Sequence, residues 1–266
     1  MKKVIFQGTI SIFLFVGTFF ILTKIDWINI FKVPQVTDKT EEKLGELFWD
    51  IFQQTEKENK NPFVVSAIDS VVSKICLANN IDREFIKVHI LVKDDINAFA
   101  LPNGHLIVYS GLIINSHNQE ELSGVICHEI AHINLNHVMK KLVKEIGLSV
   151  LISMTTGNGG PEIVKETAKI LSSSAFDRSL EKEADIKAVD YLVKARINPE
   201  PFAEFLFKLS ETENKVNNYL TWMSTHPDSK ERAEYIIEYC KSKKTIYTGA
   251  MTTATWDKLK DDIKEL

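Results

Sequence analysis

One stretch of the chain has the residue types and spacing to carry out hydrolysis: His128-Glu129-Ile130-Ala131-His132, an H-E-x-x-H pattern. On an α-helix, residues four apart lie on one face, so both imidazoles can bind one metal ion. Glu129 follows the first histidine and can act as a general base beside the open coordination position. The pattern therefore predicts a zinc hydrolase, provided that the stretch is helical and that a third ligand exists.

A third ligand is available further along the chain, in Glu181-Lys182-Glu183-Ala184-Asp185. Glu181 and Asp185 share one face of a helix, whereas Glu183 points elsewhere. Glu181 can complete a set of two histidines and one glutamate, which is a catalytic zinc ligand set. Asp185 can accept the free N–H of a ligand histidine and fix its tautomer. This spacing is common on solvated helices, so alone it would not indicate a metal site. It indicates one here because it follows the H-E-x-x-H motif.

The residues around the two histidines have the spacing of an amphipathic helix. Ser116 with Gln119, or Asn118 with Glu121, has capping-box spacing and marks its start. The alternative is a surface helix with two solvated histidines. We favour the metal site because a buried, unpaired imidazole would cost free energy that metal binding removes. The apolar residues recur at mostly three- and four-residue intervals: Leu122, Val125, Ile126, Ile133, Val138, Leu142 and Ile146.

The strand signal is confined to residues 86–110, immediately before this helix. Residues 86–92, 97–101 and 105–109 are expected to be strands, with a turn at Pro102-Asn103-Gly104 between the last two. Elsewhere, apolar stripes indicate helices, one of which starts at Asn61-Pro62. The predicted fold class is therefore α+β: mostly helical, with a small sheet whose edge borders the metal cleft.

Several other features are expected to be structural. His89 and His105 lie in or beside strands, and neither has a spaced partner, so both are expected to be structural or exposed. Cys76 and Cys127 are expected to be small buried core residues, while the sequence names no disulfide pair for Cys240. Residues 146–154 are apolar but too short to span a membrane, and residues 155–161 indicate a loop between helices.

The N-terminus has the pattern of a membrane anchor. Lys2 and Lys3 precede residues 4–22, which carry no charge and can just span a bilayer as a helix. No small-residue cleavage site ends the apolar run, so an uncleaved anchor is favoured over a long signal peptide. We expect residues 1–24 to be the anchor, 25–40 a linker and 41–266 the catalytic domain, which the two lysines place outside the cytoplasm.

Length and composition limit the remaining possibilities. The chain has 266 residues and a net charge of −4, with no strong basic block. The length allows one substantial domain plus an attachment segment. The charge makes nucleic acid an unexpected partner.

Four motifs in a fixed order carry a resemblance to a known family. They are N-A-F-A-L-P-N-G at residues 97–104, L-S-G-V-I-C-H-E-I-A-H at 122–132, S-L-E-K-E-A-D at 179–185 and S-T-H-P-D-S-K-E-R at 224–232. Over roughly residues 43–239 the chain resembles the zinc metallopeptidase family of HtpX, CAAX prenyl protease type 1, BepA and mitochondrial Oma. It is most similar to the BepA and Oma branch. The resemblance implies a zincin (gluzincin-like) metalloprotease domain.

The same resemblance implies a ligand set. One Zn²⁺ per chain would be held by His128, His132 and Glu181, with Glu129 as the base and Asp185 orienting a ligand histidine.

Three further assignments come only from the resemblance. His226 would lie near the metal, either stabilising the oxyanion or capping the zinc in a closed state. Arg232 would belong to the same motif, as a substrate contact or a structural ion pair. The strand at the cleft would pair with the substrate backbone through Asn97, Ala98, Phe99 and Ala100.

These features predict a membrane-anchored zinc metalloendopeptidase that cleaves unfolded or misassembled envelope proteins. The alternative is a zinc-stabilised, non-catalytic, chaperone-like binding protein, which Glu129 disfavours because a structural zinc site needs no base. A prenyl-peptide protease is disfavoured because the chain shows one credible span. The helical-repeat modules that follow the protease domain of BepA are not expected here, so its way of recruiting substrates does not transfer.

Overall fold

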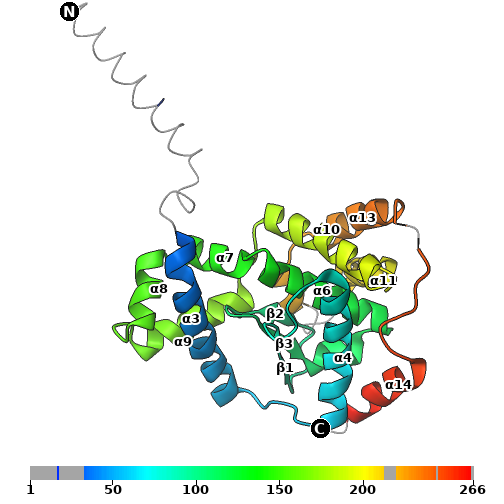
Figure 1. The fold of residues 1–266 in the computed structure, drawn as a ribbon, viewed down its shortest axis with the longest axis horizontal. Helices are drawn as coiled ribbons and strands as arrows, with labels where there is room; N and C mark the ends of the chain where they lie inside the picture. The colour runs from blue at the N-terminus through cyan, green and yellow to red at the C-terminus, as the bar shows by residue number, and fades with distance from the viewer. Residues whose placement is uncertain (1–16, 18–32, 213–219, 244, 265–266) are drawn as a thin grey trace, which may run out of the picture. The chain divides into compact units, whose positions relative to one another are not determined.

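The computed structural model describes residue 17 and residues 33–212, 220–243 and 245–264 (Figure 1). The chain divides into two units, residues 1–40 and residues 41–266. The predicted anchor at residues 1–24 lies outside the described residues, apart from Gly17. Helix α3 begins at Val33, so the second half of the predicted linker is helical. Pro34 lies in the first turn of α3, where a missing backbone N–H leaves no partner unsatisfied.

Helices make up most of the described residues, as predicted, and the strands lie together early in the chain. The elements are α3 (Val33–Thr55), α4 (Pro62–Asn79), β1 (Lys87–Leu91), β2 (Ala98–Ala100), β3 (His105–Tyr109), α5 (Ser110–Asn115), α6 (Gln119–Asn134), α7 (His137–Glu145), α8 (Leu148–Thr155), α9 (Pro161–Ser173), α10 (Arg178–Lys194), α11 (Glu200–Thr212), α12 (Leu220–Thr225), α13 (Ser229–Cys240) and α14 (Thr253–Asp262).

The three predicted strands form one mixed sheet in the order β1-β3-β2. β1 and β3 run parallel, with Lys87 opposite His105, and β2 runs antiparallel to β3, with Ala98 opposite Val108. Asn103 and Gly104 make the turn between β2 and β3 with φ values of 60° and 73°, a left-handed conformation that asparagine and glycine tolerate best. This arrangement leaves β2 at one edge of the sheet, where it contacts helix α6 (Gln119–Asn134), which carries the histidine motif.

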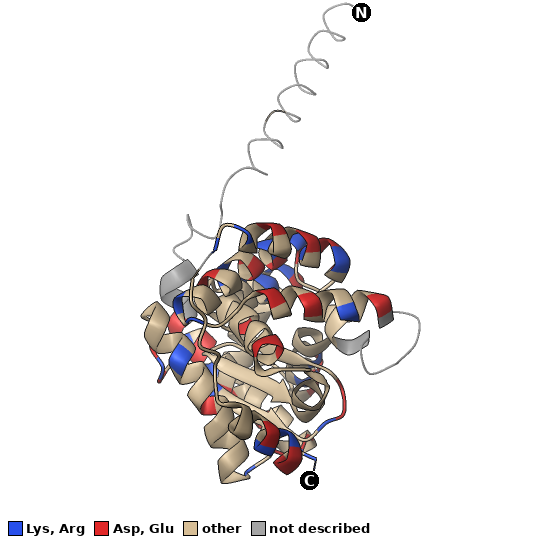
Figure 2. Cartoon of the chain, turned by 90° about the vertical axis from the view of Figure 1, so that its right-hand side faces the viewer, with Lys and Arg blue, Asp and Glu red and all other residues tan. Residues whose placement is uncertain are grey.

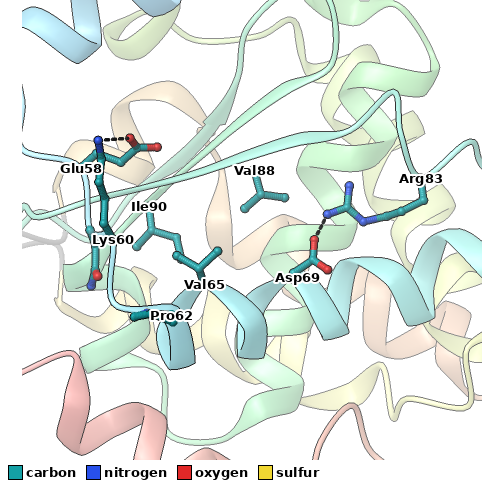
Figure 3. Close-up of a pocket in the computed structure, with 9 residues that line it drawn as sticks. Glu58, Lys60, Pro62, Val65, Asp69, Arg83, Val88 and Ile90 are labelled. Carbon is teal, nitrogen blue, oxygen red and sulfur yellow. Dashed lines mark hydrogen bonds and ion pairs between the residues drawn. The ribbon is translucent and has the colours of Figure 1, made fainter.

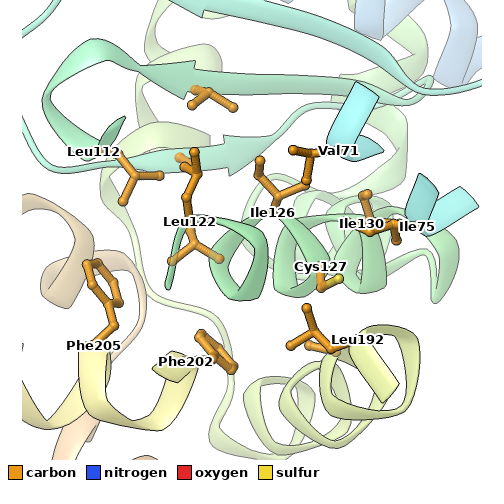
Figure 4. Close-up of a cluster of buried hydrophobic side chains, with 14 of the residues drawn as sticks. Val71, Ile75, Leu112, Leu122, Ile126, Cys127, Ile130, Leu192, Phe202 and Phe205 are labelled. Carbon is orange, nitrogen blue, oxygen red and sulfur yellow. The ribbon is translucent and has the colours of Figure 1, made fainter. Parts of the chain in front are cut away.

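Helix α6 is the central element of the fold. Its start is as predicted, because the Asn118 side chain accepts a hydrogen bond from the backbone N–H of Glu121. Every residue from Glu121 to His132 is buried. Figure 4 shows Ile126 and Ile130 facing Val71 and Ile75 of α4, while Cys127 faces Leu192 of α10. A helix that is covered on all sides can hold polar groups in fixed positions, away from water.

The predicted continuation of this helix to Ile146 is wrong. Helix α6 ends at Asn134, and α7 starts at His137. Between them, Asn136 adopts a left-handed conformation with φ of 56°, which ends the helical path. The chain therefore changes direction directly after the H-E-x-x-H motif.

The core consists of two apolar clusters. One surrounds α6 between α4, α10 and α11, and the other joins α3 to β2, α7, α8 and α9. Leu151 and Met154 of α8 belong to the second cluster, so the apolar stretch at 146–154 packs in the core. Among the described helices, only α4 is long and apolar enough to cross a membrane, and its residues Val64, Ile68 and Val71 are fully buried in the first cluster.

Acidic and basic residues are interspersed along the outer helices (Figure 2). A cavity of about 390 Å³ lies between α4 and β1, with Val65 and Ile90 in its wall (Figure 3). The Asp69–Arg83 ion pair lines it, as do Glu58 and Lys60. None of the residues that line this cavity belongs to the histidine motif, which lies elsewhere.

Candidate active site

Four side chains from three parts of the chain meet at one point beneath the surface. His128 and His132 come from α6, Glu181 from α10, and His226 follows the end of α12. One ligand atom from each of them lies within 4.8 Å of the other three, and all four residues are buried. The structure therefore brings together the two motif histidines, the predicted third ligand and the histidine that was placed here only by resemblance.

The distances within this group fit a small cation. Nε2 of His128 lies 2.9 Å from Nε2 of His132 and 3.2 Å from Nδ1 of His226. An Oε1 atom of Glu181 lies 2.9 Å from Nδ1 of His226 and 3.2 Å from Nε2 of His132. A tetrahedral zinc with bonds of about 2.0–2.2 Å holds its ligand atoms about 3.3–3.6 Å apart, so these atoms lie a few tenths of an ångström closer together than a bound zinc would hold them. The nitrogen and oxygen lone pairs of these four side chains point toward one another. A metal ion bound between them would satisfy them all.

The protonation states also suit a metal ligand set. Burial and the neighbouring His128 lower the pKa of His132 to about 3, and burial lowers the pKa of His226 to about 4. Burial opposes ionisation of Glu181, but Arg232 and the histidines hold the pKa of that carboxyl well below its usual value. At neutral pH His132 and His226 are thus neutral and Glu181 is a carboxylate, the forms that bind metal.

Glu129 lies beside these four groups and is fully buried. Its Oε1 is 3.4 Å from Nε2 of His226, and neither of its oxygens has a hydrogen-bond partner among the described residues. Burial and the Glu181 carboxylate raise the pKa of Glu129 well above its usual value. A buried carboxyl whose pKa is raised in this way, beside a metal ligand set, is suited to accept and release a proton.

A buried network of hydrogen bonds and ion pairs contacts the ligand set. An Oδ1 atom of Asp185 lies 2.8 Å from Nδ1 of His128. Arg232 donates two hydrogen bonds of 2.8 Å to the two oxygens of Asp185, and its third nitrogen lies 2.6 Å from Glu181. The hydroxyl of Tyr235 also donates to Asp185. Of the two roles that were open for Arg232, this geometry favours the structural ion pair. Arg232 and Glu181 also line a cavity of about 240 Å³.

Aromatic side chains enclose the site. The Trp222 ring stacks on His226 with centroids 4.6 Å apart, and the Phe176 ring stacks on His132 at 4.0 Å. Lys141 is buried, donates to the carbonyl of Ser174 and lies over the Phe176 ring. The segment around Phe176, which follows α9, therefore covers the ligand set directly.

The predicted substrate strand lies next to the site. Ala98, Phe99 and Ala100 form β2, at the edge of the sheet, and they are buried. The backbone of Ala100 faces Glu129 and favours its ionised form. The amide of Asn97 is also buried, and neither its oxygen nor its nitrogen has a hydrogen-bond partner among the described residues. Helix α9 packs against β2.

Some partnerships were missed at the sequence level. Nδ1 of His137 lies 3.1 Å from Nδ1 of His132, and its Nε2 lies 3.3 Å from Glu183. Glu183 points away from the ligand set, as predicted, but its partner was not foreseen. The only signal was a third histidine five residues after His132, which is not a ligand spacing on a continuous helix.

His89 and His105 lie in β1 and β3 as structural residues, as expected, but their contact with each other was not foreseen. Nε2 of His89 lies 2.9 Å from Nδ1 of His105, and Trp49 stacks on His89. Parallel pairing of β1 with β3 creates this contact, and the sequence gives no register from which to foresee it. Cys76 and Cys127 are buried free thiols, as expected, and so is Cys240.

Comparison with known proteins identifies related chains. The profile of peptidase family M48 matches residues 64–239. Metalloprotease LoiP of Escherichia coli (strain K12) is 31% identical over 166 residues, which cover 60% of this chain and 65% of LoiP. Mitochondrial metalloendopeptidase OMA1 of Bos taurus is 31% identical over 163 residues, 56% of this chain and 31% of OMA1.

A third relative is the beta-barrel assembly-enhancing protease of Yersinia pestis, 24% identical over 179 residues, which cover 63% of this chain and 37% of that protein. The chain thus spans less than two thirds of the length of each of these three relatives. The resemblance inferred from the four motifs is confirmed, including the branch of BepA and Oma.

Proposed function

Because this chain belongs to peptidase family M48, we propose that it is a zinc metalloendopeptidase whose ligands are His128, His132 and Glu181. The observation that carries the proposal is the convergence of these three buried side chains, with a fully buried carboxyl, Glu129, beside them. A structural zinc site has no use for such a carboxyl, because its positions are closed by protein ligands.

Each residue then has a defined task. A bound zinc ion supplies Lewis-acid chemistry, which polarises a peptide carbonyl and lowers the pKa of water. The carboxylate of Glu129 takes a proton from the attacking water and delivers it to the leaving nitrogen. Asp185 keeps the proton of His128 on Nδ1, so that Nε2 faces the metal. Arg232 holds Asp185 in place through its two hydrogen bonds.

We propose that the structure represents a closed form, in which His226 caps the metal site. Its Nδ1 is one of the four converging atoms, and its Nε2 faces Glu129. The side chains of His128, Glu129, His132 and His226 are 0% exposed, so a peptide reaches them only after the covering segments move. This supports capping over the other role considered for His226, the stabilisation of an oxyanion.

The substrate strand belongs to the same proposal. An extended peptide would pair with the edge of β2, and the unpaired amide of Asn97 would hydrogen-bond to its backbone. Movement of α9, which packs against β2, would open access to this edge. Backbone pairing selects extended chains with little regard to side chains, which suits unfolded or misassembled proteins as substrates.

The location is proposed from the sequence and the relatives. Residues 4–22 would anchor the chain in a membrane, and Lys2 and Lys3 would keep the N-terminus in the cytoplasm, so the catalytic domain would lie on the other side. One relative is named for beta-barrel assembly, which supports envelope proteins as the substrate class. Labelling of Cys-substituted surface positions with a membrane-impermeant reagent in intact cells tests this placement, and protection of the whole domain would refute it.

One observation favours a second candidate function. If His226 stays on the metal, the site is a closed structural centre, and the protein is a zinc-stabilised, chaperone-like binding protein. This candidate predicts that unfolded chains are bound but not cleaved, even when His226 is replaced by alanine.

Metal analysis tests the ligand set. The full-length wild type should purify with about one zinc per chain, and Glu181→Gln should lose most of it, since an amide oxygen is a poor zinc ligand. The matched control is Glu204→Gln, which changes an exposed glutamate of α11, outside the site. Unchanged zinc in Glu181→Gln would remove Glu181 from the ligand set.

A further inference from the structure

His137 has no part in the reaction described above, although it is fully buried beside a ligand. It begins α7, and its Nδ1 lies 3.1 Å from Nδ1 of His132. The two rings meet edge to face, with centroids 5.0 Å apart. On the other side, Nε2 of His137 lies 3.3 Å from a carboxylate oxygen of Glu183, whose side chain is 53% exposed. A chain of three side chains therefore runs from His132 to the surface.

The donors and acceptors in this chain are determined by chemistry. His132 directs Nε2 to the ligand cluster, so a neutral His132 must carry its proton on Nδ1 to bind metal through Nε2. That N–H needs an acceptor, and Nδ1 of His137 is within reach. His137 then carries its own proton on Nε2, which points to the carboxylate of Glu183. Each nitrogen thus has a single role.

The backbone is built to place His137 there. On a continuous helix, a residue five positions after His132 would lie about 140° around the axis, facing another direction. Asn136, in its left-handed conformation, changes the direction of the chain between α6 and α7. The new direction places His137 against the ring of His132. The helix break that the sequence did not predict is the feature that makes this contact.

From this geometry we infer that His137 and Glu183 are positioning residues that fix the tautomer and orientation of the ligand His132. The inference rests on the metal site of the proposed function. Asp185 does the same for His128 directly, in a buried network. His132 has no carboxylate of its own at Nδ1 within the described chain. His137 connects Nδ1 of His132 to the exposed carboxylate of Glu183.

The test measures zinc affinity of the full-length, metal-stripped protein by competition with a chromophoric chelator. His137→Leu removes the acceptor and should weaken zinc binding about 10–100-fold. His137→Asn places Oδ1 close to the position of Nδ1, so it should restore most of that affinity. His117→Leu is the control, because His117 lies at the start of α6 with 70% of its side chain exposed; its affinity should equal that of the wild type.

A double-mutant cycle tests whether Glu183 acts through His137. Glu183→Ala should weaken zinc binding a few-fold in the wild type, and not at all in His137→Asn, which cannot reach Glu183. Because Glu183 is exposed, this arm stays informative even if His137→Leu does not fold.

The outcomes separate this inference from the proposed function. If the wild type binds zinc and His137→Leu binds it equally well, the relay is wrong while the metal site stands. Equal losses in His137→Leu and His137→Asn, or an equal effect of Glu183→Ala in both backgrounds, would also overturn the relay. If the wild type itself binds no zinc, the proposed function fails, and the relay fails with it.

Discussion

Arg232 donates two hydrogen bonds, each 2.8 Å long, to the two carboxylate oxygens of Asp185, and both residues are buried. The same guanidinium reaches Glu181, so one cation holds a carboxylate that orients a ligand and a carboxylate that is a proposed ligand. The planar fork of arginine suits this task better than the point charge of lysine. The ligand set therefore depends on a residue that need not touch the substrate.

Removing Arg232 should destabilise the protein strongly. Arg232→Leu leaves two buried carboxylates without their cation, so the free energy of unfolding should fall by about 3–5 kcal/mol. Urea denaturation of the metal-free protein measures this. The control is Arg178→Leu, because Arg178 pairs with Asp228 at 2.7 Å but is 77% exposed; its loss should be below about 1 kcal/mol. Equal losses in the two variants would contradict the structural role of Arg232.

Replacing His226 should separate capping from catalysis. If His226 closes the metal site, His226→Ala should bind zinc more weakly yet cleave unfolded casein faster at saturating zinc, since the capping imidazole is gone. The matched control is His117→Ala, an exposed histidine outside the site. Cleavage that falls by about 100-fold or more in His226→Ala would instead assign this imidazole to the stabilisation of an oxyanion.

The pair His89 and His105 should make stability depend on pH. Burial, together with Lys87 and His89, lowers the pKa of His105 from 6.5 to about 4. Between about pH 4 and pH 6.5, His105 is protonated in the unfolded chain but neutral in the folded chain. Stability from this group is thus present above pH 6.5 and is lost as the pH falls toward about 4, by at most about 3 kcal/mol.

His105→Asn tests this dependence, because its amide can donate to His89 but does not titrate. Urea denaturation of the metal-free protein between pH 7 and pH 5 should show a shallower loss of stability for the variant than for the wild type. The same slope in both proteins would show that His105 is not the group responsible.

Much of the fold and the site followed from local signals. The Asn118 cap, the Asn103-Gly104 turn and the alternating strands depend on neighbouring residues, so the sequence indicates them directly. The motif histidines and Glu181 followed from helical spacing combined with ligand chemistry. His226, by contrast, was found only through family resemblance, because its contact with Glu181 joins segments that are far apart in the chain.

Other features depend on tertiary structure. The helix break at Asn136 contains no glycine or proline, the residues that usually indicate a break in the sequence. The left-handed conformation of this asparagine is seen only in the folded chain. The His89–His105 contact needs the register of two parallel strands. The contact of His137 with His132 depends on the break at Asn136, so the sequence could not reveal it before the break was known.

The most direct test of the central claim compares cleavage by the wild type and Glu129→Gln, both full-length and both loaded with zinc. Glu129→Gln keeps the size of the side chain and leaves the proposed ligands intact, but it cannot take up a proton. We predict about one zinc per chain in both proteins, with cleavage of unfolded casein by the wild type alone. Cleavage by zinc-loaded Glu129→Gln at the wild-type rate would contradict the account.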